Sequence, residues 1–369
     1  MKMFKKPIPV LIITINQFST KKLTVIKFRE PERIKTNFAI QSQTMSETFK
    51  YPWGHSKRYN DFSTHFRSKF NGRVQKISVN AGFTCPNRDG TRGVGGCTYC
   101  NNKTFQPSYC DLNNVLKIQI KEGIDFFSRK YTTMRYLAYF QSYTNTYAPI
   151  SVLRELYNEA LQYPGVIGLV IATRPDCLND EVLDLLEELL QKSYIMVELG
   201  VETIENRTLE RINRGHTWEE SVRALEETAR RSIHNCAHLI LGLPGENYSD
   251  FIEQARVISS LPVEIIKLHQ LQIHTGTAMA YEYSQFPDRF HPFSVEEYAE
   301  LVVDYLENLN PAIIVERFVS SAPDAMVIAP RWGMKNYEFV AKVEKRLLKR
   351  DTWQGRIWEN EMKNEGMKE

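Results

Sequence analysis

Cysteine is scarce in this chain and unevenly placed. Six cysteines in 369 residues are too few and too irregularly spaced for a fold held by disulfide bonds. We therefore expect reduced thiols and a cytoplasmic location, where reduced thiols persist. The cysteines are then available for metal binding or for core packing.

The chain also lacks a long apolar run. The apolar stretch at residues 8–15 is far shorter than the about 20 residues of a membrane-spanning helix. No small-residue cleavage pattern follows it, as a secretory signal would require. We therefore expect no membrane partner. Residues 1–44 are interpreted as a disordered or non-native extension with Met45 as an alternative start; an edge strand is the other interpretation.

A strong excess of charge is missing as well. The net charge is +3, and residues 1–44 hold nine Lys or Arg against two Asp or Glu, which leaves −4 for the remainder. Net charge therefore gives no reason to expect nucleic acid as a partner. With 42% apolar and 25% charged residues, the composition is typical of a globular chain with a full core.

Short β-branched runs alternate with amphipathic stretches from about residue 70. Strands are predicted at Gln75–Ala81, Tyr136–Ser142, Val166–Thr173, Tyr194–Val201, Asn235–Leu241 and Glu264–Ile273. Helices are predicted at Val115–Arg129, Ile150–Gln162, Asp180–Lys192, Thr217–Ser232 and Tyr248–Ser260. This order indicates an α/β fold with a parallel sheet, either doubly wound or a partial (β/α)6 TIM-like barrel.

Polar side chains recur on one face of three predicted strands. By the period of two, Glu198 and Glu202 share a face, and Lys267 and His269 share another, while His238 points away from its apolar neighbours. Strands of a doubly wound sheet are usually apolar on both faces, so this pattern favours a barrel interior that holds ligands. The candidate catalytic residues are His238, Lys267 and His269, with a structural role as the alternative.

The C-terminal part is expected to form a small α+β accessory region over residues 290–369, after a core barrel over residues 45–289. Helical periodicity covers Val295–Leu309 and Tyr337–Arg350, and a strand is predicted at Ile313–Phe318.

Three cysteines crowd into one run, C-x11-C-x2-C, formed by Cys85, Cys97 and Cys100. The run follows the first predicted strand, at the end where α/β folds place their sites. Three thiolates indicate a soft metal or an iron–sulfur cluster. Structural zinc usually takes four ligands, often from two C-x2-C pairs, so zinc would need Cys110 as the fourth. Cys177 and Cys236 are interpreted as buried thiols.

This run resembles the cysteine loop of the radical S-adenosylmethionine (SAM) superfamily, which ends in C-x-aromatic-C, with Tyr99 at the aromatic position. The usual spacing is C-x3-C-x2-C, and the wider gap here is similar to that of the Elongator catalytic subunit. Further segments resemble the YhcC-like family of radical SAM proteins, over roughly residues 51–356: Tyr51–Gly54, Asn80–Gly90, Thr144–Pro149, Ala172–Cys177, Arg211–His216, Leu241–Glu246 and Lys267–Gln272.

The resemblance implies a [4Fe-4S] cluster on Cys85, Cys97 and Cys100 whose free iron binds SAM. The reduced cluster would cleave SAM to a 5′-deoxyadenosyl radical that abstracts hydrogen from a substrate. An electron donor such as flavodoxin or ferredoxin is implied as a partner.

The resemblance also implies which residues contact SAM. Tyr99 would pack near the adenine. Glu202 would meet the ribose or carboxylate, with Glu198 as a second ribose candidate. Arg214 would bind the carboxylate, with Arg211 as the alternative.

Two further segments complete the implied SAM site. Gln141 and Tyr143 occupy the place of the glycine-rich segment that meets the SAM amino group, so their backbone carbonyls are the candidates. Ile240 and Gly242 resemble the segment that flanks the adenine.

Basic and aromatic residues interleave over residues 50–76, as in surfaces that bind single-stranded RNA, and residues 342–350 add positive charge. A solvated helix face with core aromatics is the alternative. The likeness to the Elongator subunit makes tRNA a candidate substrate. A zinc-stabilised nucleic-acid-binding protein without redox chemistry is the alternative function, and the oligomeric state stays open.

Overall fold

The computed structural model describes residues 51–129 and 134–365, with side chains described up to residue 360. The predicted extension over residues 1–44 and the alternative start at Met45 lie outside these ranges. Within the described ranges, no helix combines the length and the apolar character that crossing a membrane requires.

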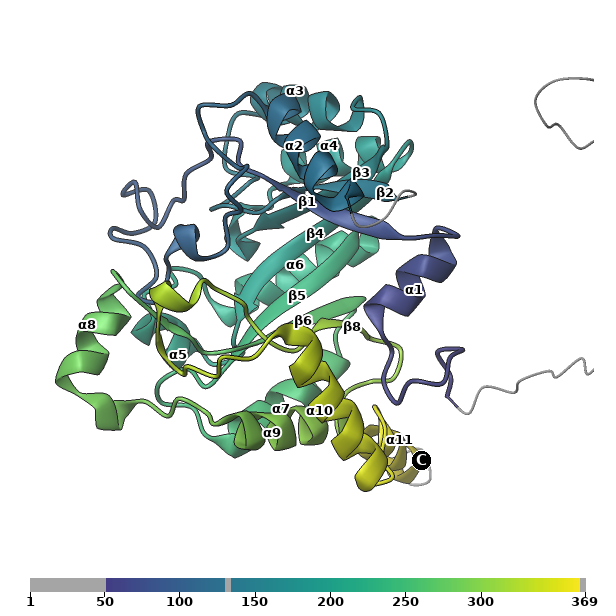
Figure 1. Ribbon diagram of the computed structural model, residues 1–369, viewed down its shortest axis with the longest axis vertical. Coiled ribbons are helices and arrows are strands. Elements are labelled where there is room, and N and C mark those ends of the chain that lie inside the picture. The colour runs from purple at the N-terminus through teal and green to yellow at the C-terminus, as the bar shows by residue number, and fades with distance from the viewer. Residues whose placement is uncertain (1–50, 130–133, 366–369) are drawn as a thin grey trace, which may run out of the picture. The chain divides into compact units, whose positions relative to one another are not determined.

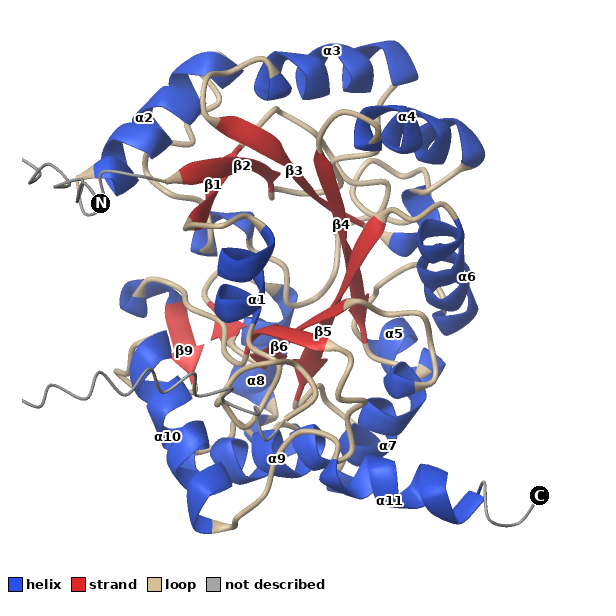
Figure 2. Cartoon of the chain, turned by 90° about the vertical axis from the view of Figure 1, so that its right-hand side faces the viewer, coloured by secondary structure: helices blue, strands red, loops and turns tan. Residues whose placement is uncertain are grey.

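The main sheet has seven strands, all parallel, arranged in the order in which they follow along the chain. The strands are β1 (Val74–Val79), β2 (Arg135–Phe140), β3 (Val166–Thr173), β4 (Tyr194–Glu202), β5 (His234–Leu241), β6 (Ile265–Gln270) and β8 (Ile314–Arg317). Figure 2 shows that the sheet curls into a partial barrel. The predicted α/β half-barrel is confirmed, and the strand predicted in the accessory region adds a seventh strand to it.

The last predicted strand of the core is divided in two. After β6 the chain forms the short strand β7 (Ile273–His274), which pairs antiparallel with β9 (Val327–Ala329) in a separate two-stranded sheet. The accessory region therefore contacts the core through two different sheets.

Helices surround the curled sheet (Figures 1 and 2). The α-helices are α1 (Phe62–Lys69), α2 (Leu116–Ser128), α3 (Ile150–Leu161), α4 (Asp180–Leu190), α5 (Asn206–Arg211), α6 (Trp218–Arg230), α7 (Tyr248–Ser259), α8 (Ala278–Gln285), α9 (Val295–Glu307), α10 (Asn336–Lys349) and α11 (Arg356–Glu365). The predicted helices match α2, α3, α4, α6, α7, α9 and α10 within about two residues at each end, whereas α1, α5, α8 and α11 were not predicted.

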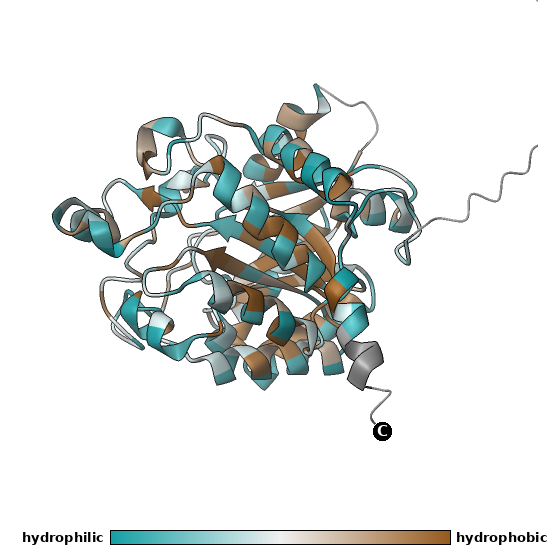
Figure 3. Cartoon of the chain, turned by 90° about the horizontal axis from the view of Figure 1, so that it is seen from below, coloured by the Kyte–Doolittle hydropathy of each residue, from teal (hydrophilic) through white to brown (hydrophobic). Residues whose placement is uncertain are grey.

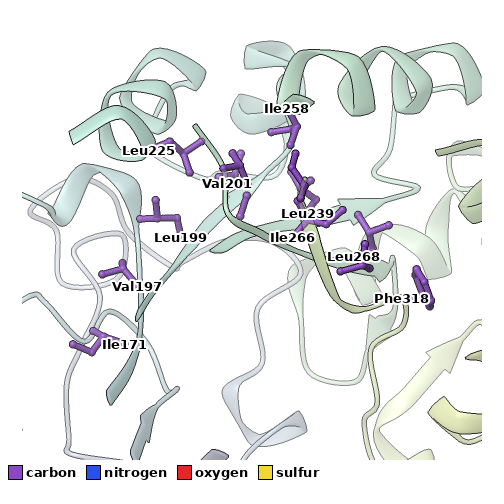
Figure 4. Packing of buried hydrophobic residues seen from close by; sticks show 14 of the residues in the cluster. Ile171, Val197, Leu199, Val201, Leu225, Leu239, Ile258, Ile266, Leu268 and Phe318 are labelled. Atoms are coloured by element: carbon purple, nitrogen blue, oxygen red, sulfur yellow. The ribbon is translucent and has the colours of Figure 1, made fainter. Parts of the chain in front are cut away.

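The main core lies between the sheet and these helices. Alternate residues of β4 and β5, such as Val197, Leu199 and Leu239, point to this side and are fully buried (Figure 4). Figure 3 shows the same division by hydropathy, with hydrophilic helix faces on the outside. The remaining residues of these strands point to the inside of the barrel, as the period of two predicts.

Helix α1 fills one end of the barrel interior rather than its outside. Phe66 is buried in a cluster with inward-facing residues of β2 to β6 and β8, and Phe62 and Phe70 pack against the same cluster. The segment before α1 pairs with β8 through a bridge between Asp61 and Val315. The aromatic residues that suggested RNA binding are therefore largely packed inside the protein, which was the alternative interpretation of residues 50–76.

Part of the positive charge of residues 342–350 is also paired within the fold. Helix α10 packs along α9, and its basic side chains pair with acidic ones of α9. These ion pairs join Lys342 and Arg346 to Glu296, Arg346 to Glu300, and Arg350 to Asp304 and Glu307. Lys345 and Lys349 are exposed without such a partner among the described residues, so the segment is only partly neutralised.

Candidate active site

One pocket lies at the carboxyl end of the barrel, where the three clustered cysteines meet the inward faces of the strands. It contains all but one of the residues predicted for the site: Cys85, Cys97, Tyr99, Cys100, Gln141, Tyr143, Glu198, Glu202, Arg214, His238, Ile240, Lys267 and His269. The exception is Gly242. A Cβ atom there would lie 2.8 Å from the ring of Phe293, so Gly242 serves close packing beside the pocket.

The wide gap in the cysteine run is a loop that docks on the segment after α5. The Asn87 side-chain amide donates to the Asn213 carbonyl at 2.5 Å, and the Asn213 amide donates back to the Gly96 carbonyl at 2.9 Å. The Thr98 backbone NH donates to the Ile212 carbonyl at 2.9 Å. These reciprocal bonds hold the loop against this segment.

The spacing of the sulfur atoms bears on the choice between zinc and a cluster. Thiolates on one zinc ion lie within about 4 Å of one another, because each Zn–S bond is about 2.3 Å. Among the described residues, the trio with ligand atoms within 4.8 Å of one another is Glu198, Cys236 and Glu316, not the three clustered cysteines. Cys110 lies outside the pocket, and its buried thiol donates to the Ser78 carbonyl at 2.9 Å. The four-cysteine zinc site therefore does not fit this geometry.

Arg214 joins the cysteine loop to β4. Its guanidinium lies 3.6 Å from Cys97 Sγ, donates to the Gly200 carbonyl at 2.6 Å and lies 3.4 Å from Glu202 Oε1. A Cβ atom on Gly200 would lie 2.5 Å from the guanidinium, so only glycine lets Arg214 approach the strand. Arg211, the alternative candidate, is exposed and pairs with Glu282 at 2.8 Å.

Glu202 reaches the pocket through an irregularity at the end of β4. The register with β5 shifts between Gly200 and Glu202, and Glu202 has a φ of 68°, in the left-handed region. Such bulges reorient a side chain, and strained backbone of this kind gathers at functional sites. Burial would raise the pKa of Glu202, but His238 and Arg214 lower it below its usual value. Glu202 is therefore a buried carboxylate anion.

Two histidines face the same space. The His238 ring lies 4.2 Å from the His269 ring, in an edge-to-face arrangement, and its Nδ1 lies 3.1 Å from Glu202 Oε2. Burial, with His238 and Arg317 nearby, lowers the pKa of His269 well below its usual value. The Nε2 atoms of both rings and Arg214 Nε are buried without a hydrogen-bond partner among the described residues. Buried polar atoms usually have partners, so this group indicates a polar ligand.

Four charged side chains and one tyrosine form a network at the floor of the pocket. Lys76 lies 2.6 Å from both Glu198 and Glu316, and Lys267 lies 3.0 Å from Glu198. Tyr139 donates to Glu198 at 2.5 Å. Burial alone would raise the pKa of Glu198, but Lys267 and Lys76 hold it well below its usual range. Both oxygens of Glu198 are thus engaged within the protein.

The remaining predicted residues lie around the cysteine loop. The Gln141 side chain accepts from the Ser78 hydroxyl at 2.9 Å. Tyr143 has a φ of 63°, and its backbone NH donates to Asn102 at 3.1 Å. Arg88 lies over the Tyr143 ring, with its guanidinium 5.6 Å from the ring centre.

Three arginines in the pocket, Arg88, Arg174 and Arg317, were missed from the sequence. Arg174 makes a bidentate ion pair with Asp176 at 2.9 Å and donates to the Arg214 carbonyl at 2.6 Å, so it positions Arg214. Arg317 ends β8 and lines the floor. Arg174 directly follows β3 and Arg317 ends β8, at the same edge of the sheet as Glu202. This position at the carboxyl end of a parallel strand is the signal that could have identified them.

Comparison with known proteins agrees with this arrangement. The family model "Radical SAM superfamily" matches residues 84–258, and the model "Radical_SAM C-terminal domain" matches residues 263–349. The chain is 36% identical to the uncharacterized protein YtqA of Bacillus subtilis over 85% of this chain and 98% of that protein. It is 34% identical to protein YhcC of Escherichia coli over 79% of this chain and 93% of that protein.

Two further similarities involve proteins of archaea. The chain is 26% identical to a tRNA uridine(34) acetyltransferase of Methanocaldococcus jannaschii, over 39% of this chain and 26% of that protein. The solved structure of Elp3 from Methanocaldococcus infernus has a TM-score of 0.59 at 17% identity, covering 76% of this chain and 64% of that one. The fold, the cysteine loop and the relatives agree, and the chain belongs to the radical SAM superfamily, as an enzyme with a [4Fe-4S] cluster and SAM as its cofactors.

Proposed function

We propose that Cys85, Cys97 and Cys100 hold the [4Fe-4S] cluster and that SAM binds beside it in the same pocket. The donor set suits the cluster, because three cysteine sulfurs line one pocket at a wider spacing than a single metal ion would require. The unpartnered buried nitrogen atoms Arg214 Nε and His238 Nε2 suit the polar groups of SAM. This pairing of the three cysteines with unsatisfied polar groups is the observation that carries the proposal.

The chain's own residues bind and orient the reactants. When bound, the cluster and SAM supply the reductive cleavage that yields a 5′-deoxyadenosyl radical, which removes hydrogen from a substrate. Arg214 offers a guanidinium fork to a carboxylate, and Arg174 holds Arg214 in place. Glu202 has long contacts, with His238 at 3.1 Å and with Arg214 at 3.4 Å. Glu198 is held more closely, at 2.5–3.0 Å, by two lysines and a tyrosine, so Glu202 is the better ribose ligand.

Four residues keep the roles predicted for them. Tyr99 and Ile240 line the pocket where an adenine would pack, and the backbone carbonyls of Gln141 and Tyr143 are offered to the SAM amino group. Radical SAM enzymes need a reductant, and we propose a flavodoxin or ferredoxin for this role. A reducing compartment such as the cytoplasm suits free thiols of this kind.

We propose a uridine of tRNA as the substrate. The support is the sequence relative whose name specifies tRNA uridine(34), which matches over 148 residues. A base must leave its stack to reach a pocket at the end of a barrel, and the exposed rings of Tyr143 and Phe105 at the pocket are suited to stacking on it.

Metal analysis tests the cofactor assignment. Protein purified without oxygen is expected to contain about four irons and four sulfides per chain, as one [4Fe-4S] cluster requires. Cys97→Ala is expected to lose the cluster, whereas Cys110→Ala, which changes a buried thiol outside the pocket, is expected to keep it. One zinc per chain without sulfide, lost in the Cys110 variant, would support the nucleic-acid-binding alternative instead.

Nucleoside analysis tests the substrate. Total tRNA from a strain lacking the gene is expected to lose one modified uridine, or to accumulate its precursor, relative to the parent strain. Plasmid-borne wild-type protein should restore the parent pattern and Cys97→Ala should not. Identical nucleosides in all strains would reject tRNA as the substrate while leaving the cofactor assignment in place.

A further inference from the structure

The ion-pair network beneath the pocket is balanced in charge, because Lys76 and Lys267 face Glu198 and Glu316. Arg317 lines the same pocket and adds one positive charge to this balanced network. An uncompensated charge in a partly buried site is costly unless a ligand offsets it.

Arg317 is the cation without a partner. No hydrogen bond or ion pair joins its guanidinium to any other residue in the described part of the chain, although it is half-buried. The two carboxylates of the neighbouring network already form ion pairs with lysines. Glu316 pairs with Lys76 at 2.6 Å, and Glu198 pairs with Lys76 and Lys267. The five N–H donors of Arg317 are therefore available to a ligand.

The surroundings of Arg317 supply further hydrogen-bond donors. Ser320 and Ser321 follow β8 and line the same pocket. The low pKa of His269, caused by burial and by neighbouring cations that include Arg317, keeps its ring neutral, so one ring nitrogen is a donor. The His269 Nε2 atom is buried without a partner among the described residues. These groups face the pocket from two different strands, β6 and β8.

We propose that the floor of the pocket binds an anionic group of the substrate, a carboxylate or a phosphate, with Arg317 as its main ligand. A guanidinium fork matches either group, because both present two oxygens in one plane. Ser320, Ser321 and His269 complete the subsite.

Anion titration tests this inference. The cluster-loaded protein is titrated calorimetrically with sodium phosphate and, separately, with sodium acetate, each against sodium chloride of equal ionic strength. At least one anion is expected to bind, and Arg317→Met is expected to weaken that binding about tenfold or more, since a charge-assisted bond is lost. If only phosphate binds, the anionic group of the substrate is a phosphate. If only acetate binds, the group is a carboxylate. If both bind, the subsite accepts either kind of anion, as the guanidinium geometry allows.

Arg289→Met is the matched control, because Arg289 is exposed, pairs with Glu282 and lies outside the pocket. If Arg317→Met fails to load its cluster, Arg317→Lys is titrated in its place. Its anion affinity is expected to be about threefold or more below that of the wild type, because lysine lacks the two-pronged guanidinium. The inference is overturned if neither anion binds beyond the chloride control, or if the Arg317 variants match Arg289→Met. The inference rests on the proposed function only in naming the anion as part of the substrate. Because anion binding is measured without SAM, the inference and the proposed function can fail independently of each other.

Discussion

At the scale of single residues, two glutamates on one strand face have different roles. Glu198 and Glu202 are four residues apart on β4, and both line the pocket. Lys76, Lys267 and Tyr139 surround Glu198 at 2.5–3.0 Å. Glu202 has longer contacts, with His238 at 3.1 Å and with Arg214 at 3.4 Å. The period of two predicted their common face but not this difference, because the partners of Glu198 come from strands far away in the sequence.

The two candidate arginines can be separated by measurement. Arg214→Met is expected to weaken SAM binding by about tenfold to a hundredfold, since a charge-assisted bond is worth about 1.5–3 kcal/mol. Arg211→Met is the control and should leave the affinity unchanged, because its exposed side chain pairs with Glu282. Equilibrium dialysis of SAM, expressed per cluster, gives both values. Equal affinities in the two variants would contradict the assignment.

Glu246 makes stability depend on pH. Burial raises its pKa to about 7, although the Thr203 hydroxyl donates to it at 2.5 Å. A carboxyl group with a raised pKa binds its proton more tightly in the folded state, so folding is favoured below pH 7 and the gain disappears as pH rises through 7.

We therefore expect wild-type protein to lose about 1 kcal/mol of stability relative to Glu246→Gln between pH 6 and pH 8. Urea unfolding of both proteins at the two pH values measures this difference. A constant difference would show that the carboxyl group does not titrate in this range.

At the scale of elements, the alternation of residues predicted the strands and helices of the barrel well. β3 was predicted to the residue, and the inward positions of His238, Lys267 and His269 are as expected. The role of α1 was missed, because nothing local shows that its phenylalanines fill the end of a barrel. That packing depends on inward residues from six strands, which sequence periodicity does not bring together.

Lys76 links the two edges of the open sheet. It lies on β1 and pairs with Glu316 on β8, the strand at the other edge, as well as with Glu198. Lys76→Met is expected to destabilise the protein by about 3–5 kcal/mol, because it leaves buried carboxylates without their partner.

A double-mutant cycle isolates this link. The variant Lys76→Met/Glu316→Gln should lose less stability than the sum of its single variants, by about 1 kcal/mol or more, since the two groups are in contact. Chemical unfolding of the four proteins provides the values. Strict additivity would contradict an ion pair that joins the two edges.

At the scale of the whole molecule, the two basic segments that suggested RNA binding are partly neutralised within the fold. The basic side chains of α10 pair with α9, and the basic stretch near α1 includes Lys76, which lies in the buried network. In the pocket, Arg317 is half-buried and has no partner among the described residues. We therefore expect the pocket, rather than a distant surface, to determine which substrate is used.

The most direct test of the central claim is the formation of 5′-deoxyadenosine. Protein with its cluster, SAM and dithionite are incubated without oxygen, and the nucleoside is quantified by chromatography for wild type and Cys97→Ala. The wild type is expected to release 5′-deoxyadenosine, and the variant is expected to release none. A wild-type protein that carries its cluster and SAM but forms no 5′-deoxyadenosine would contradict the account.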